Sequence, residues 1–131
     1  GWAVGSNQTL IRTQDSGESW QRQIITPERD VALTSVHFVD PNNGWIIGIL
    51  PTGGGVLLNT TNGGVNWREQ QTNTTLNLNH LYFFDRQNGI ITGGSNPARQ
   101  GIILRVNHYY SFTITGNCSC NTISDLYWMF F

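Results

Sequence analysis

Lysine is missing from this chain of 131 residues, and charge of either sign is scarce. Only 11% of the residues are charged, about half of the usual share, and the formal net charge is -1. Such a surface has no excess of positive charge with which to attract phosphate groups. The composition therefore argues against binding to nucleic acid or to an anionic membrane.

Long apolar runs are missing as well. The longest one, "DLYWMFF" at residues 125–131, falls far short of the roughly 20 residues that cross a bilayer. We therefore expect no membrane span. The chain opens on Gly1, inside a repeat that is described below, so we expect that processing or truncation has removed what came before.

Signatures of metal binding and of nucleophilic catalysis are absent too. Cys118 and Cys120 are separated by one residue, so a disulfide between them would be strained, and a zinc site would need other ligands. His37, His80 and His108 do not have the spacing of a known zinc motif, and no nucleophile elbow is present. We expect no metal, no cofactor and no nucleophilic catalysis.

What the sequence does contain is a repeat rich in glycine, asparagine and threonine. The phrase "TQDSGESW" at residues 13–20 returns as "TTNGGVNW" at residues 60–67, and "GWAVG" at residues 1–5 returns as "GWIIG" at residues 44–48. A third copy, "GIITGG", begins at Gly89. Similar segments that return at a regular spacing are the sequence signature of a repeat fold.

The period is close to 45 residues, because Val36, Leu81 and Leu126 follow one another at that spacing in aromatic-rich segments. Within one period the apolar pattern and the glycine- and asparagine-rich turns predict four strands. The strands of the complete period are expected at residues 33–40, 45–50, 56–60 and 67–71. The second of these is apolar throughout, as expected of a strand that is buried on both faces.

Four strands in such a period are typical of a β-propeller blade. We therefore predict an all-β chain with about three blades of four antiparallel strands, as part of a larger or oligomeric ring. The predicted blade repeats cover residues 1–32, 33–77 and 78–122, and a further blade begins at residues 123–131. Neighbouring blades, in the same chain or in a homo-oligomer, are expected to cover the end blades.

The eight-residue phrase resembles the Asp-box, or bacterial neuraminidase repeat, written Ser/Thr-x-Asp-x-Gly-x-Thr-Trp. Asp15 can accept hydrogen bonds from its own turn, Gly17 can adopt a left-handed conformation, and Trp20 can cover the hairpin and pack toward the next blade. Two copies at one repeat position favour a structural clasp over a catalytic or sugar-binding site. The predicted structural residues are Thr13, Asp15, Gly17, Trp20, Thr60, Asn62, Gly64 and Trp67.

The longer repeat, "GWAVGSNQTLIRTQDSGESW", is similar to the unit of the photosystem II stability and assembly factor family, roughly "NGWAVG-x-G-x-ILRTTDGGxTW". The resemblance covers residues 1–105 well. It implies a seven-bladed propeller in the thylakoid lumen or periplasm that holds assembly intermediates without a cofactor or catalysis. Departures from the pattern are Asn62 in place of Asp, an insertion at residues 50–53, a lost third box and a length of three blades.

Two other classes remain open. One is a fragment of a sialidase-like glycoside hydrolase, which needs paired carboxylates or an arginine cluster, although no acidic residue here has an evident partner. The other is an extracellular adhesion or receptor propeller. Arg12 and Arg105 occupy the same repeat position with Asn59 between them, and could form a patch that binds a carboxylate or an acidic peptide of an unidentified protein partner. The simpler explanation is that Arg12 and Arg105 both occupy strand positions that are exposed to solvent.

Overall fold

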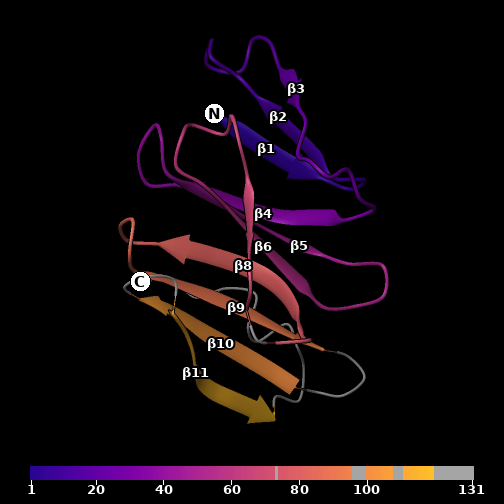
Figure 1. The fold of residues 1–131 in the computed structure, drawn as a ribbon, viewed down its shortest axis with the longest axis vertical. Coiled ribbons are helices and arrows are strands. Elements are labelled where there is room, and N and C mark those ends of the chain that lie inside the picture. Colours follow the sequence, from indigo (N-terminus) through magenta and orange to yellow (C-terminus); the bar gives the residue numbers. More distant parts are fainter. Residues whose placement is uncertain (73, 96–99, 108–110, 120–131) are drawn as a thin grey trace.

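The computed structural model describes residues 1–72, 74–95, 100–107 and 111–119. Within these residues every regular element is a β-strand, and the strands form three antiparallel sheets (Figure 1). The predicted all-β fold of antiparallel blades is confirmed. No helix in this part of the chain could cross a membrane.

The first sheet has three strands, in the order β1 (Trp2–Gly5), β2 (Thr9–Arg12) and β3 (Gln21–Gln23). The second sheet has four, β4 (Ala32–Phe38), β5 (Gly44–Ile49), β6 (Gly55–Thr60) and β7 (Arg68–Gln70). The third sheet also has four, β8 (Asn77–Phe83), β9 (Gly89–Ser95), β10 (Gln100–Asn107) and β11 (Ser111–Ser119). In the second sheet, all four strands lie where the sequence predicted them, within about two residues at each end.

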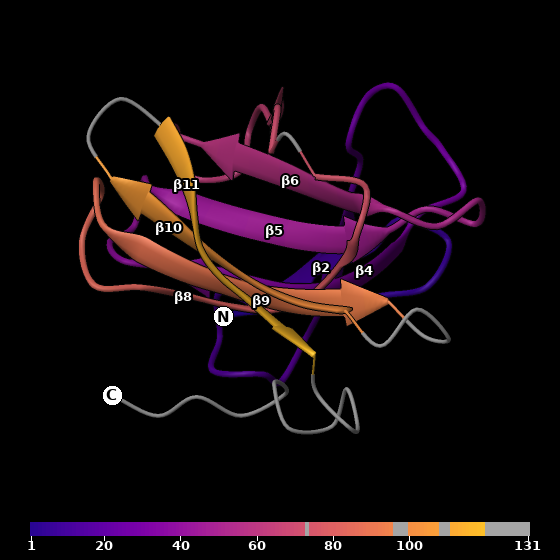
Figure 2. The same ribbon diagram turned by 90° about the horizontal axis from the view of Figure 1, so that it is seen from below.

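The sheets follow one another along the long axis of Figure 1, and Figure 2 shows the third sheet lying across the second. Strands β1 and β2 contact β4, and strands β4, β5 and β6 contact β8, so each sheet packs on the next one in the chain. A sheet at the middle of such a stack needs two apolar faces, whereas an end sheet needs one.

Strand β5 shows this requirement most clearly. Its residues Gly44 to Gly48 are all buried. Ile46 packs in the apolar cluster that joins the second sheet to the first, and Trp45 and Ile47 pack in the cluster that joins it to the third. The prediction of a strand buried on both faces is confirmed. Complete burial of each isoleucine stabilises the fold by about 2–3 kcal/mol.

A ring contact between neighbouring sheets explains the repeated "GW" dipeptide. Trp2 stacks on Phe38 with ring centroids 4.9 Å apart, and Trp45 stacks on Phe83 at 3.8 Å. Each phenylalanine in turn lies under the glycine that starts the adjacent strand of its own sheet. A Cβ on Gly44 would lie 2.6 Å from the ring of Phe38, and one on Gly89 would lie 2.6 Å from the ring of Phe83. Glycine is required there because any side chain would displace the phenylalanine ring.

The predicted start of a further blade at residues 123–131, with Leu126, lies outside the described residues, as does Cys120. Cys118 lies on β11, and its side chain is outside the described part of the structure.

Candidate functional site

The first Asp-box forms a closed network of short-range hydrogen bonds between β2 and β3. The Thr13 hydroxyl donates to Asp15 Oδ1 at 2.7 Å and accepts from the Gly17 N–H at 2.9 Å. Asp15 also accepts from the N–H and the hydroxyl of Ser19, which hold the pKa of this carboxyl well below its usual range. Gly17 has φ +97°, a left-handed conformation that glycine adopts without strain.

The second Asp-box has the same network although an amide replaces the carboxylate. The Thr60 hydroxyl donates to Asn62 Oδ1 at 3.0 Å and accepts from the Gly64 N–H at 3.0 Å. Asn62 Oδ1 also accepts from the Asn66 N–H at 3.0 Å. An amide oxygen can accept these bonds as a carboxylate does, so the departure from the Asp-box pattern at Asn62 leaves the turn intact.

The tryptophans that end the two boxes have different surroundings. Trp67 is only 9% exposed and meets Trp2 and Phe38 edge-on, at centroid distances of 6.3 and 5.9 Å. Trp2 belongs to the preceding sheet, so Trp67 packs toward the blade before its own. Trp20 is 45% exposed and lies over its own turn, 3.9 Å from where a Cβ on Gly17 would be.

A second repeated turn joins the first two strands of a blade, and the sequence analysis did not predict the role of its aspartate. Asp40 accepts hydrogen bonds from the backbone N–H groups of Asn42 and Asn43 and from the Asn43 side chain. Asp85 does the same with Gln87 and Asn88. The signal was available, because Asp-x-x-Asn-Gly occurs at residues 40–44 and again at residues 85–89.

Asp40 also joins the second sheet to the third. Arg86 Nε donates to Asp40 Oδ2 at 2.9 Å. The Asn43 amide, with help from the Asn42 and Asn43 N–H groups and from Arg86, lowers the pKa of Asp40 to about 2. Because these donors all favour the ionised carboxylate, Asp40 is poorly suited to act as a general acid.

The two arginines of the predicted patch are not brought together. Arg12 lies 5.2 Å above the Trp2 ring, in a cation–π contact. Arg105 is exposed on β10, in the third sheet, and the second sheet separates the two (Figure 1). Asn59, at the same repeat position, is buried and donates to the Gly44 and Thr60 carbonyls.

Arg12 borders a hollow between the first and second sheets. Its volume is about 530 Å³, and Trp2, Phe38 and Pro41 give it an apolar side. Arg12, Gln14 and Asp40 supply polar groups to the same hollow. We name it the Arg12 hollow. A guanidinium beside aromatic rings is a suitable binding site for a carboxylate on an otherwise apolar peptide.

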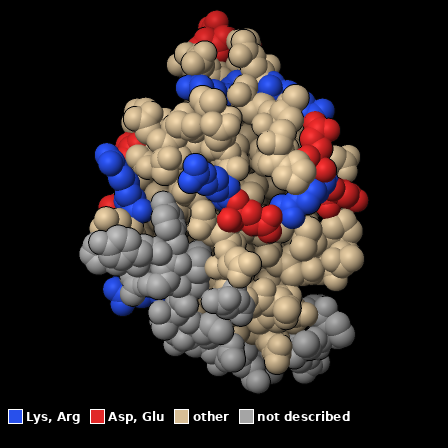
Figure 3. Space-filling model, viewed as in Figure 1, with Lys and Arg blue, Asp and Glu red and all other residues tan. Residues whose placement is uncertain are grey.

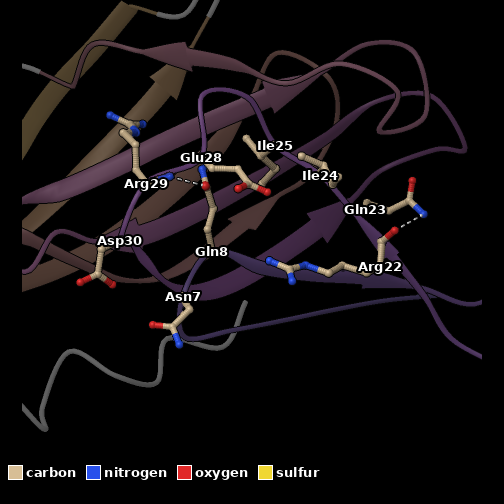
Figure 4. Close-up of a pocket in the computed structure, with 9 residues that line it drawn as sticks. All are labelled: Asn7, Gln8, Arg22, Gln23, Ile24, Ile25, Glu28, Arg29 and Asp30. Carbon is tan, nitrogen blue, oxygen red and sulfur yellow. Dashed lines mark hydrogen bonds between the residues drawn. The ribbon is translucent and has the colours of Figure 1, made fainter.

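A smaller pocket of about 320 Å³ lies where the first sheet connects to the second (Figure 4). The Arg29 N–H donates to Gln8 Oε1 at 2.7 Å in its wall. The acidic side chains of Glu28 and Asp30 do not point toward each other in Figure 4, and Arg29 is paired with Glu69 at 2.8 Å. This pocket therefore lacks the facing carboxylates of a glycosidase.

Charge on the face shown in Figure 3 is sparse, with basic and acidic side chains interleaved. No cluster of three or more potential metal-ligating side chains occurs in the described ranges. His37 is half-buried with its ring 4.9 Å from that of Tyr82, and burial lowers the pKa of His37. His108 lies outside the described residues.

Comparison with known proteins agrees with the repeat pattern. The family model described as photosynthesis system II assembly factor YCF48 matches residues 1–77. Photosystem II assembly lipoprotein Ycf48 of Synechococcus sp. (strain CC9902) is 37% identical over 78 residues. Those residues make up 58% of this chain and 22% of that protein.

A solved structure described as YCF48 bound to D1 peptide shows the same fold. It matches 87% of this chain with a TM-score of 0.69 and 24% sequence identity, and the match covers 36% of the solved chain. The present chain thus spans about a third or less of the length of these relatives. Since the family model covers more than half of the present sequence, the chain belongs to the photosynthesis system II assembly factor YCF48 family.

Proposed function

We propose that this chain is part of a non-catalytic β-propeller that binds a protein partner during photosystem II assembly. The observation that carries the proposal is the family match over residues 1–77. The chain shares its fold with the YCF48 structure that is bound to a D1 peptide. This likeness supports recognition of the partner through a peptide segment. The relative's description as a lipoprotein supports an extracytoplasmic location.

The bonding of the acidic residues supports a binding role over the sialidase alternative. Asp15, Asp40 and Asp85 are each held by donors from their own turns. Glu69 is paired with Arg29. A retaining or inverting glycosidase needs two carboxyl groups that face one another across the substrate. These four carboxylates instead stabilise turns and sheet contacts.

Within the described residues, the Arg12 hollow is the place that we assign to the partner. It combines a guanidinium with the rings of Trp2 and Phe38, and aromatic residues and arginine are the side chains that contribute most at protein interfaces. Arg105 is too far from this hollow, across the second sheet, to contact the same short peptide segment. We therefore assign carboxylate recognition to Arg12 alone.

The test is a binding titration with fluorescent overlapping peptides that tile the D1 protein. We expect one or a few peptides to bind, and Arg12→Ala to weaken that binding by about tenfold or more, because a charge-assisted hydrogen bond is lost. The matched control is Arg22→Ala, since Arg22 is an exposed arginine of the same sheet that does not border the hollow.

Equal loss in both variants would show that only net charge matters and would reject the Arg12 hollow. Failure of every D1 peptide to bind, or hydrolysis of a fluorogenic sialoside by the purified protein, would reject the proposed function itself.

A further inference from the structure

The Arg12 hollow adjoins a further pocket of the first sheet. This pocket has a volume of about 210 Å³, and Arg12 and Gln14 line both cavities. The other residues that line it are Asp15, Ser19 and Gln21, so it lies against the first Asp-box. We name it the box pocket. A peptide that reaches Arg12 through the hollow therefore has the Asp-box directly beside it.

The strand register explains why the two cavities adjoin. Trp2 pairs with Arg12, and Arg12 pairs with Gln21, so their side chains form one row on one face of the sheet. Leu10 lies on the same face and packs in the cluster that joins the first sheet to the second. The row therefore faces the second sheet, with the hollow at its Trp2 end and the box pocket at its Gln21 end.

Each cavity contains a carboxylate in addition to Arg12. Asp40 borders the hollow, and Asp15 borders the box pocket. The Asn43 amide is the main cause that lowers the pKa of Asp40 to about 2. The Ser19 hydroxyl is the main cause that lowers the pKa of Asp15. Both carboxyl groups are therefore negatively charged at neutral pH, and Arg12 lies between two negative charges.

Asp15 can accept a further hydrogen bond. In the part of the chain that the structure describes, Oδ1 accepts from the Thr13 hydroxyl and the Ser19 N–H, and Oδ2 accepts from the Ser19 hydroxyl. A carboxylate has about four lone pairs, so Oδ2 has capacity for a donor from a ligand. These three donors are neutral, whereas Asp40 is paired with the cationic Arg86. Asp15 therefore favours a positively charged or hydrogen-bond-donating group in the box pocket.

The equivalent positions of the second blade carry different charges. The corresponding row contains Asn59 and Arg68, and the acceptor of the box is the neutral Asn62. Asn59 is buried and donates to backbone carbonyls. The combination of a half-buried arginine with an anionic box therefore distinguishes the first blade from the second and does not follow from the repeat.

We propose that the Arg12 hollow and the box pocket together select a peptide with a defined charge pattern. Arg12 binds one carboxylate, the rings of Trp2 and Phe38 contact an apolar side chain, and the box pocket binds a hydrogen-bond donor, of which lysine fits best. This inference rests on the proposed function, because it concerns the same bound peptide. A second acidic residue next to the first would meet Asp15 or Asp40, and such a contact between like charges disfavours the wrong partner.

The test uses the D1 peptide that binds most tightly in the titration described above. The residues next to each of its acidic residues are replaced, one at a time, by lysine, leucine or glutamate. At one of these positions we expect lysine to bind about fivefold to tenfold more tightly than glutamate, because an attractive contact replaces a repulsive one near the surface. The preference should shrink at about 1 M salt, where the screening length is about 3 Å.

Asp15→Asn removes the charge of the box and keeps its acceptor. The variant is expected to fold, because Asn62 accepts the same turn hydrogen bonds in the second box. We expect the preference for lysine over glutamate to fall to about twofold or less. The matched control is Asn62→Asp, which adds a carboxylate to a box that lines neither cavity and should leave the preference unchanged.

Gln21→Lys is a second variant that does not alter the box. Gln21 is exposed on β3, and a lysine there adds a positive charge to the box pocket. The preference for lysine in the peptide should again fall to about twofold or less. Far-UV circular dichroism verifies that each variant is folded.

A peptide that binds through Arg12 with the same preference in the original chain, in Asp15→Asn and in Gln21→Lys would overturn this inference and leave the proposed function in place. Equal binding of the lysine and glutamate peptides at every position would do the same. Failure of every D1 peptide to bind would reject the proposed function and this inference together.

Discussion

The two Asp-boxes share their hydrogen bonds but differ in the burial of the tryptophan that ends them. Trp67 is 9% exposed, whereas Trp20 is 45% exposed. The turn is local, because the threonine hydroxyl and the Asp or Asn side chain make their hydrogen bonds within the same phrase. The environment of the tryptophan depends on the preceding sheet, which supplies Trp2 to Trp67. Within one repeat, therefore, sequence identity preserves the turn and the neighbouring sheet decides the packing.

Removal of the two tryptophans should give the largest difference between the boxes. Trp67→Ala leaves a cavity beside Trp2 and Phe38 and is expected to lower the free energy of unfolding by about 3–5 kcal/mol. Trp20→Ala removes a half-exposed ring and should cost below about 1 kcal/mol. Urea denaturation of both variants measures the difference, and equal losses would show that the box tryptophan stabilises its own turn.

The glycines of the two boxes should show a smaller difference of the same kind. Gly17→Ala and Gly64→Ala both force a side chain into positive φ, at +97° and +83°. At Gly64 the new Cβ would also lie 2.4 Å from the Trp2 ring, whereas at Gly17 the nearest ring atom is 3.9 Å away.

We expect Gly64→Ala to cost about 2–4 kcal/mol and Gly17→Ala about 1–2 kcal/mol. Thermal unfolding, monitored by circular dichroism, measures which of the two variants loses more stability. A larger loss at Gly17 would mean that backbone strain outweighs the contact between sheets.

The smallest expected difference concerns pH, because only the first box contains an ionisable acceptor. The pKa of Asp15 is lowered in the folded state below its ordinary value of 3.8. Its contribution to stability is therefore present above pH 3.8 and is lost as the pH falls through the folded-state pKa.

Asp15→Asn makes the first box resemble the second, and the variant should lose less stability between neutral pH and acid than the original chain does. Asp40, whose folded-state pKa is about 2, also titrates in acid, so the quantity to compare is the difference between the two chains. Identical acid unfolding curves would show that the Asp15 hydrogen bonds do not contribute to the folded state.

Much of this fold was predictable because the relevant signals are short-range. The strands of the second sheet were predicted from apolar runs between glycine- and asparagine-rich turns, and their predicted bounds match those in the structure closely. The hydrogen bonds of Asp40 and Asp85 within their turns were equally predictable, because the pentapeptide Asp-x-x-Asn-Gly is repeated, but only the turns themselves were predicted.

Interactions between sheets were less predictable. The contact of Trp67 with the preceding sheet, the ion pair of Arg86 with Asp40 and the separation of Arg12 from Arg105 depend on how the blades stack. The repeat position of a residue predicts where its side chain lies within its own blade. It does not predict which residues of the neighbouring blade that side chain contacts.

By itself, the sequence determined the all-β class, the four-stranded repeat, the family and the two kinds of turn. Each of these is predicted by local signals, which are the repeat period, the conformational preference of glycine and hydrogen bonds between residues close together in the chain. Only the tertiary structure decided that Gly44 and Gly89 make room for phenylalanine rings, that Trp67 is buried against the preceding sheet, and that Arg12 and Arg105 lie apart. These features arise where one sheet meets another, and packing at such contacts depends on residues far apart in sequence.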